Sequence, residues 1–483
     1  MRGIRSIAGV AVIALLATAC GGSNPSPAAS GGATSSSPPA ATSSAAAPSA
    51  AAASFAPAQL RWYCCLGTGE DPAQVPTENE VAAGFGQKYP GSSLKLEVVT
   101  YDNARSTLST QIASGNPPDL VGPAGVGGLA AFQGQWLDLG PYIAKTGYDT
   151  SQYDPAAVEF YNTAEGQIGL PFAVYPSMLW YKNDMFEEAG LAPPPHQYGA
   201  KYAMPDGTEV DWNYDTIREL GLKLTVDKNG KDATEAGFDP KSIVQYGFEP
   251  QRDDLRALGA YWGAGSLAAD DGTTVKVPEP WKVAWKFFYD GMWKDHFIMN
   301  GSVYESDEFS GGGYSFFSGR VAMSENFLWT TYGVADAGTD WDLAAIPSHN
   351  GTATSPLNAD TFAIQKGTKN PDAAWAGLQY ILDDSSDTLL QLYGGMPARP
   401  EKQDAFFETL GQSEGFPEKV DWQVAKDSLE YADNPNFEAP MPKYNETLTI
   451  LGKYLSKWTT TDGLDMDAEI SALEKEIQAT WDS

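Results

Sequence analysis

The chain has 483 residues, of which 62 are acidic and 31 are basic, and its net charge is −31. So large a negative charge argues strongly against binding of nucleic acid or anionic lipid through the folded surface. The length is enough for two large lobes or for two to three domains, and three cysteines are too few for a disulfide framework.

Residues 1–20 have the pattern of a secretory signal peptide. Two arginines form a basic start, and the apolar run that follows them is too short to span a bilayer. The end resembles a lipobox, in which Cys20 becomes diacylated, although Ala17 stands where a large aliphatic residue is usual. We expect export and anchoring of Cys20 on the outer face of a bacterial cytoplasmic membrane. Cleavage after the Ala-Thr-Ala sequence at 17–19, with release of a free protein, is the alternative.

Residues 21–58 consist almost wholly of Ser, Ala, Pro and Gly. Such a composition buries too little apolar surface to offset the entropy of ordering, so we expect a disordered tether. The folded body is then expected over 59–483, where no stretch has the length and apolar character of a membrane span.

Apolar runs and periodic apolar residues alternate along the start of the folded body. They predict, in chain order, strand 60–66, helix 78–89, strand 94–99, helix 106–114 and strand 119–121. This alternation indicates right-handed βαβ units and a parallel sheet. Further along, the pattern predicts helices over 281–293, 371–382 and 466–481, and hairpin-like polar insertions at 206–212 and 225–240.

Cys64 and Cys65 are neighbours at the end of the first expected strand. In an oxidising compartment they can form a vicinal disulfide. Two reduced thiols buried on the strand, behaving as small apolar side chains, are the alternative.

The segment 227–232 begins like a calcium-binding loop. Its glycine comes too early, and Phe238 stands where the bidentate glutamate is required. A β-turn at Asn229-Gly230 explains the segment better, so we expect no metal there.

Several segments of the folded body carry a recognisable pattern in a fixed order. They are residues 85–90, 94–98 and 110–119, then 169–191, then 316–326 with Trp329, and finally 393–398. In this order they resemble the first lobe, the first crossing between lobes, the ligand edge of the second lobe and the third crossing of the extracellular sugar-binding proteins of ABC importers. Together the matching segments span residues 60–450.

The resemblance implies an α/β fold of two lobes, the type II-like periplasmic-binding-protein fold. Each lobe would have a mostly parallel sheet flanked by helices, and a hinge of about three crossings would join the lobes. The ligand would sit in the cleft, outside the carboxyl ends of the strands. The implied lobes are residues 59–174 with 360–393 at the N-terminal side and residues 175–359 with 394–483 at the C-terminal side.

The resemblance also implies a function. The protein would bind a mono- or oligosaccharide and deliver it to the transmembrane permease subunits of an ABC importer, whose cytoplasmic ATPase supplies the energy. We expect an exported, lipid-anchored monomer with no catalytic activity, no cofactor and no metal.

Candidate ligand contacts follow the ends of the expected strands. Thr68 and Glu70 follow the first strand, and Tyr101 and Asp102 follow the second. Such loops face the cleft of an open α/β sheet, and their hydroxyl and carboxylate groups suit sugar hydroxyls. For Asp102, capping of the following helix is the alternative.

Further contacts are implied by the resemblance. Trp329 matches the family's stacking tryptophan, Asn326 lies on the same edge, and Tyr175 occupies a contacting position in the first crossing. For Glu249, the alternative to ligand contact is capping of a helix. For Arg399, whose charge would allow a uronate ligand, the alternative is an ion pair at the surface. The predicted ligand-binding set is Thr68, Asp102, Tyr175, Glu249, Asp253, Trp262, Asn326, Trp329, Asp360, Met396 and Arg399.

Two rival classes deserve a test. A secreted glycosidase or lyase needs two carboxylates across a cleft, which 62 acidic residues do not exclude, but the chain has none of the common hydrolase or nucleotide motifs. An adhesive or purely structural surface lipoprotein would not need βαβ lobes joined by hinge-like segments. A binding protein is stabilised by one sugar and turns nothing over.

Overall fold

The computed structural model describes residues 55–153, 155–163, 165–252, 254–311, 314–338 and 340–483. The predicted signal peptide, Cys20, most of the predicted tether and Asp253 lie outside these residues. Ala53–Ser483 forms one compact unit. Among the described residues, no helix has both the length and the apolar character needed to cross a membrane.

Within the described residues, ten strands pair into one sheet. Its order is β2-β1-β3-β15-β6-β11-β10-β9, and β12 and β16 also pair with β6. The strands are β1 (Gln59–Cys64), β2 (Ser93–Val98), β3 (Leu120–Gly125), β6 (Leu170–Lys182), β9 (Val226–Asp227), β10 (Ile243–Pro250), β11 (Val321–Phe327), β12 (Trp341–Ala344), β15 (Leu357–Ile364) and β16 (Met396–Pro397). Short hairpins are β4 (Asn162–Thr163) with β5 (Gly166–Gln167), β7 (Lys201–Ala203) with β8 (Glu209–Asp211), and β13 (Ser348–His349) with β14 (Thr352–Ala353).

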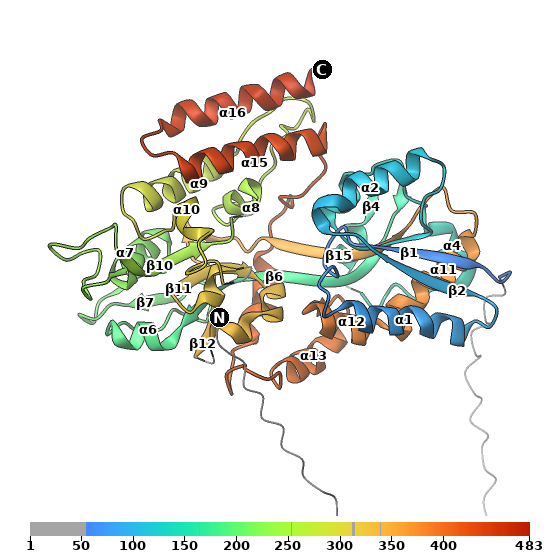
Figure 1. The fold of residues 1–483 in the computed structure, drawn as a ribbon, viewed down its shortest axis with the longest axis horizontal. Helices are drawn as coiled ribbons and strands as arrows, with labels where there is room; N and C mark the ends of the chain where they lie inside the picture. The colour runs from blue at the N-terminus through green and yellow to red at the C-terminus, as the bar shows by residue number, and fades with distance from the viewer. Residues whose placement is uncertain (1–54, 154, 164, 253, 312–313, 339) are drawn as a thin grey trace, which may run out of the picture. The chain divides into compact units, whose positions relative to one another are not determined.

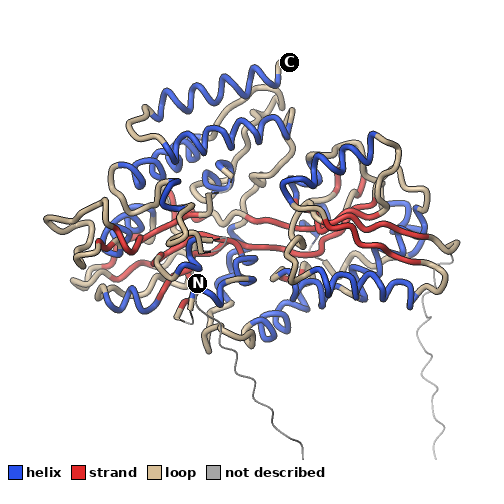
Figure 2. The backbone as a smooth tube through the Cα atoms, in the orientation of Figure 1, coloured by secondary structure: helices blue, strands red, loops and turns tan. Residues whose placement is uncertain are grey.

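The sheet has two halves, each with its own group of parallel strands, and the strands β6 and β15 belong to both halves. Strands β1, β2 and β3 are parallel, as predicted, and so are β10 and β11. The shared strand β6 is antiparallel to both β15 and β11. Figures 1 and 2 show β6 and β15 running from the strands of one half to those of the other. All thirteen residues of β6 are buried, which fits its mostly apolar sequence.

Helices cover the faces of both halves, and Figure 1 shows α1 and α12 on one face of β1 and β2 with α2 on the other. The helices of the first half are α1 (Val75–Lys88), α2 (Tyr101–Ala113), α3 (Val126–Ala130), α4 (Gly140–Thr146), α5 (Pro155–Glu159), α11 (Pro371–Gln379), α12 (Ser386–Tyr393) and α13 (Gln403–Leu410). Those of the second half are α6 (Asn183–Glu188), α7 (Tyr214–Leu224), α8 (Leu255–Ala260), α9 (Glu279–Trp293), α10 (Gly301–Tyr304), α14 (Gln423–Asp427), α15 (Tyr444–Thr460) and α16 (Met466–Trp481).

The spacing of apolar residues in the last helix, α16, predicts that one of its faces packs on the folded body. In α16, Ile470, Leu473 and Ile477 are buried, and Asp465 caps the helix by accepting from the backbone N–H of Asp467 and Ala468. The helix packs beside α15, and Lys453 of α15 is bonded to Glu476 of α16 at 2.7 Å. The predicted amphipathic helix therefore faces the core of this half.

The position at which the chain leaves the first half differs from the predicted lobe boundary at residue 394. Met396 and Pro397 form β16, which pairs with Val174 and Ala173 in the first part of β6. The helix α13 then packs on β16. The pairing therefore keeps the chain with the first half at least as far as α13.

Candidate functional site

A cavity of about 880 Å³ lies between the two halves of the sheet. One side is formed by the β1–α1 loop and by the start of α2, and the other by α8, by α15 and by the 3-10 helix η2 (Leu328–Tyr332). Residues of the shared strands β6 and β15 also line it. The cavity is thus built from elements that the sequence separates by several hundred residues.

Aromatic rings form one wall of this cavity. Trp329 stacks on Phe327 with ring centroids 4.4 Å apart, and its indole N–H donates to the Tyr314 hydroxyl at 2.8 Å. The Tyr175 ring lies 5.5 Å from the Trp329 ring at an angle of 59°. Because its edge and one face are held, Trp329 is a fixed platform for a flat apolar surface.

Carboxylates lie at the inner end of the cavity. Asp360, on β15, is 5% exposed, and burial raises its pKa to about 7, with the Glu438 charge acting in the same direction. Burial likewise raises the pKa of Glu438, against the nearby Arg256. Such groups accept hydrogen bonds from ligand hydroxyl or amino groups.

Two arginines face the cavity from opposite halves. Arg256, on α8, donates to Asp254 Oδ2 at 2.6 Å and lies over the Tyr444 ring at 5.3 Å. Arg105, on α2, donates to the Tyr101 hydroxyl at 2.9 Å. Both are therefore held in place before any ligand is bound.

The helix α15 contributes an aliphatic wall. Leu448, Leu451 and Leu455 line the cavity together with Gly452. Positions three and four apart lie on one face of a helix, so this face is the one turned to the cavity.

The loop after β1 forms the opposite rim. Cys64 and Cys65 are joined by a disulfide, as in one of the two predicted alternatives, and both side chains are fully buried. The Thr68 carbonyl lies 3.6 Å from Cys64 Sγ, and Gly69, whose φ is 109°, passes over the same sulfur. The disulfide thus packs directly against the loop that carries Thr68 and Glu70.

The structure brings four of the predicted residues together. Thr68, Tyr175, Trp329 and Asp360 all line the cavity. Asp253 lies outside the described residues. The other six, which do not line the cavity, are Asp102, Glu249, Trp262, Asn326, Met396 and Arg399.

The direction in which successive side chains point along a helix or strand explains why Asp102 and Asn326 do not line the cavity. Tyr101 and Arg105 of α2 line the cavity, and Asp102 is turned about 100° around the helix from Tyr101. Asn326 precedes Phe327 on β11, and successive strand side chains point to opposite faces. The Asn326 side chain instead accepts a bond from the Phe327 backbone N–H at 3.1 Å.

Three other predicted residues are engaged in the interior. The Glu249 carboxylate accepts from Arg252 Nε at 2.5 Å and from the Met299 backbone N–H at 3.2 Å. Trp262 stacks on Tyr214 with centroids 4.0 Å apart, and Met396 is completely buried. Their side chains serve packing and ion pairing, which the sequence pattern could not distinguish from ligand contact.

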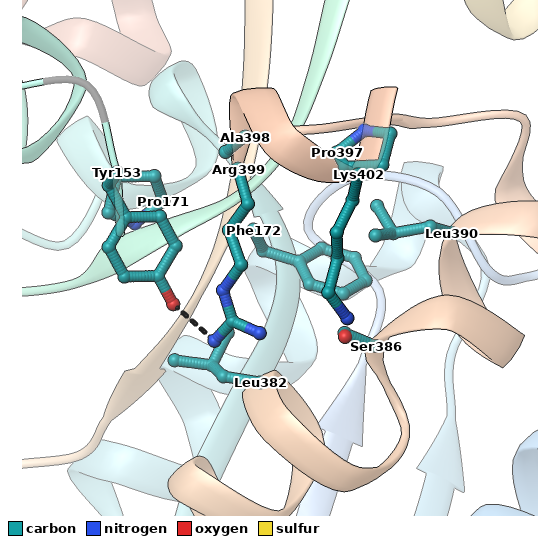
Figure 3. A pocket seen from close by; sticks show the side chains of 10 residues that line it. All are labelled: Tyr153, Pro171, Phe172, Leu382, Ser386, Leu390, Pro397, Ala398, Arg399 and Lys402. Atoms are coloured by element: carbon teal, nitrogen blue, oxygen red, sulfur yellow. Dashed lines mark hydrogen bonds between the residues drawn. The ribbon is translucent and has the colours of Figure 1, made fainter. Parts of the chain in front are cut away.

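Arg399 is also held away from the cavity. Its guanidinium donates to the hydroxyl of Tyr153 at 2.9 Å and to Asp383 Oδ1 at 2.5 Å, and Figure 3 shows it directed at Tyr153 beside Leu382. Asp383 belongs to η4 (Tyr380–Asp384), so Arg399 joins elements within the first half. The alternative of an ion pair matches this geometry, although the pair is largely buried on the Arg399 side.

Several cavity residues were not predicted. Arg105 on α2, Arg256 on α8, Glu438 before α15 and the leucines of α15 come from segments whose patterns indicate ordinary helices and loops. Tyr101 at the start of α2 was the one local signal for Arg105, since the two are four apart on a helix. Among the described residues, no three His, Cys, Asp or Glu side chains are close enough to share a metal ion.

Two lobes on shared strands, with a ligand-sized cavity between them, define the class of two-lobed α/β binding proteins. A family model described as bacterial extracellular solute-binding protein matches residues 70–387. The chain belongs to this family. A putative binding protein of Brucella abortus strain 2308 is 23% identical over 340 residues, which cover 68% of this chain and 74% of that protein.

Solved structures share the fold. An ABC substrate-binding protein of Listeria monocytogenes in complex with cycloalternan has a TM-score of 0.67 at 16% identity, over 88% of this chain and 99% of that one. The maltose/maltodextrin-binding domain MalE of Bdellovibrio bacteriovorus bound to maltotriose has a TM-score of 0.64 at 17% identity, over 88% and 100% of the two chains. The two-lobed α/β fold expected from the sequence is thereby confirmed.

Proposed function

We propose that this protein binds a carbohydrate in the cavity between its lobes and delivers it to the membrane permease of an ABC importer. The observation that carries the proposal is an aromatic wall, in which Trp329 is held as a fixed platform next to Tyr175, in the same cavity as the carboxylate of Asp360. A sugar ring offers a flat apolar face for the indole and hydroxyls for the carboxylates. The relatives of Listeria and Bdellovibrio were solved with carbohydrates bound, which supports the same ligand class here.

The ligand acts by selecting one arrangement of the lobes. Contacts such as Trp329 and Thr68 belong to different halves, so a ligand that touches both favours the closed form over the open form. The closed form docks on the permease as a monomer, and the protein releases its ligand chemically unchanged. Cys20 anchors the chain by a diacyl group, and the segment rich in Ser, Ala and Pro that follows it spans the distance from the membrane. The predicted tether is too long at its end, since Phe55 packs on Tyr89 and Ala58 is buried in the folded body.

The test is calorimetric titration of the soluble chain from residue 21, which lacks the lipid-bearing Cys20, with neutral mono- and oligosaccharides. We expect Trp329→Ala to weaken sugar binding about 10- to 100-fold, because an aromatic anchor in a binding site contributes about 1.5–3 kcal/mol. Trp481→Ala is the matched control, since Trp481 lies on α16 away from the cavity and is also partly buried. Equal affinities for both variants, or binding of no sugar by the parent chain, would contradict the proposal.

Anchoring has its own test. When the full chain is expressed in a bacterial host, it is expected in the membrane fraction and in the detergent-rich phase after Triton X-114 partition. Cys20→Ala removes the only thiol available for acylation ahead of the folded body and is expected to move the protein to the aqueous phase. A parent chain that partitions into the aqueous phase would favour the released form instead.

A further inference from the structure

Two carboxylates, that of the buried Asp360 and that of the half-buried Glu438, lie beside a glycine that lines the cavity. A methyl group placed on Gly125 would lie 3.5 Å from Asp360 Oδ1 and 3.9 Å from Glu438 Oε2. Gly125 closes β3 and itself lines the cavity. The space that its missing side chain leaves is therefore flanked by both acids and open to a ligand.

Neither of these acids is in an ion pair, although Arg256 and Arg105 lie near enough to Glu438 to lower its pKa. Among the described residues, no lysine or arginine forms an ion pair with Asp360 or Glu438; the basic groups facing Glu438 are Arg256, which is paired with Asp254 at 2.6 Å, and Arg105. Glu438 Oε2 accepts from the Gly127 backbone N–H at 3.3 Å. Burying two like charges side by side is unfavourable unless a positive group or a proton comes between them.

Tyr175 supplies a third oxygen close to Asp360. Tyr175 is 1% exposed and lines the cavity, yet its hydroxyl makes no hydrogen bond to any described residue. Burial raises the Tyr175 pKa, and the nearby Asp360 carboxylate raises it further, although the hydroxyl and the carboxylate do not meet the geometry of a well-formed hydrogen bond. A buried hydroxyl without a partner costs free energy that a ligand can recover.

We propose that Asp360, Glu438 and Tyr175 form a subsite for a protonated amine, so that the imported ligand is an amino-substituted carbohydrate. This rests on the proposed function and narrows its ligand class. An ammonium group donates three hydrogen bonds, one for each of these oxygens, and carries the charge that the acids lack. A neutral hydroxyl donates only one hydrogen bond and brings no positive charge to the acids.

The experiment compares sugars that differ at one substituent. Calorimetric titration of the soluble chain from residue 21 uses glucose, glucosamine and N-acetylglucosamine, the matching galactose series, and the di- to tetrasaccharides of cellulose, chitosan and chitin. We expect an amine to bind at least tenfold tighter than its hydroxyl and acetamide counterparts, because hydrogen bonds between charged groups are stronger than those of a neutral hydroxyl.

Variants locate the preference. Asp360→Asn removes one charge, and Gly125→Ala places a methyl between the carboxylates at ordinary contact distance, without requiring a left-handed backbone. Each is expected to bring the amine-to-hydroxyl affinity ratio towards one, and Glu438→Gln serves as a second test of charge if Asp360→Asn does not fold. Asp102→Asn, an exposed acid outside the cavity, should keep the parent ratio.

The outcomes separate this proposal from the broader function. Neutral sugars binding as tightly as their amines would overturn the amine subsite and leave carbohydrate binding standing. An amine preference that survives both Asp360→Asn and Gly125→Ala would place the subsite elsewhere and also overturn the proposal. Binding of no sugar at all would overturn the proposed function, and the subsite with it.

Discussion

At the scale of single residues, Arg399 shows how an arginine expected to bind ligand can serve the fold. It is 7% exposed and its Nη2 atom bonds Tyr148, Tyr153 and Asp383. We expect Arg399→Ala to lower the free energy of unfolding by about 1–3 kcal/mol, because it leaves partly buried polar groups without their donor. Ligand affinity should stay within about twofold of the parent chain.

Urea unfolding and calorimetric titration measure the two effects of Arg399→Ala separately. Lys402→Ala is the control, since Lys402 pairs with the exposed Asp387 at 2.7 Å and surface pairs contribute about 1 kcal/mol or less. A tenfold loss of affinity with unchanged stability would return Arg399 to the binding site.

At the scale of elements, the β1–α1 loop depends on a glycine above the disulfide. A Cβ on Gly69 would lie 2.7 Å from Glu78 Oε1 and 2.8 Å from Cys64 Sγ, at a φ of 109°. Gly69→Ala is therefore expected to cost about 2–4 kcal/mol of stability and to weaken ligand binding, because the loop that carries Thr68 must move.

A matched substitution isolates the backbone contribution to the Gly69 effect. Gly115 also has a positive φ, of 72°, but a Cβ there meets nothing within 4 Å. Gly115→Ala should cost only about 1–2 kcal/mol and leave affinity unchanged. If the two variants lose equal stability in urea and bind alike, the close approach to the disulfide has no energetic role.

At the scale of the whole molecule, buried acids set the dependence of stability on pH. Burial raises the pKa of Glu78 to about 7, of Glu325 to about 8 and of Asp360 to about 7. The folded state therefore holds protons that the unfolded state, with carboxyl pKa values near 4–4.5, has released. This stabilisation is full below about pH 4.5 and is lost as the pH rises through 7 to 8.

Thermal unfolding of the ligand-free chain between pH 5 and 8 measures this trend. We expect the melting temperature to be higher at pH 5 than at pH 8, with each acid contributing on the order of 1–3 kcal/mol. Glu325→Gln keeps an acceptor for the Tyr214 hydroxyl, now 2.7 Å from Glu325, and should flatten the profile. A melting temperature that rises from pH 5 to pH 8 would show that these carboxyls are ionised when folded.

The limits of sequence-based prediction follow the range of the interactions involved. The bounds of β1, α1 and β2 were predicted to within three residues, because their periodicity is local, and α9 and α16 begin within two residues of expectation. The helix α2 begins at Tyr101, five residues before the expected start, so Tyr101 and Asp102 lie in a helix and not in the expected loop. The resemblance correctly predicted that Trp329 and Tyr175 line the cavity. Its prediction for Asn326 is wrong, because the next residue of the strand, Phe327, is the one whose side chain faces the cavity. Arg105, Arg256 and Glu438 meet only through tertiary packing, which no local pattern reports.

The two strands that both lobes share have a mechanical consequence. Asn358 and Asp360 lie on β15, and Tyr175, the register partner of Asn358, lies on β6. Points near a rotation axis move least, so bending about these strands would leave this group nearly stationary. Thr68 and Trp329 lie in opposite lobes, away from these strands, and would move further when the lobes close. A ligand would then bind first to Asn358, Asp360 and Tyr175 while the lobes are open, and the lobes would close on it afterwards.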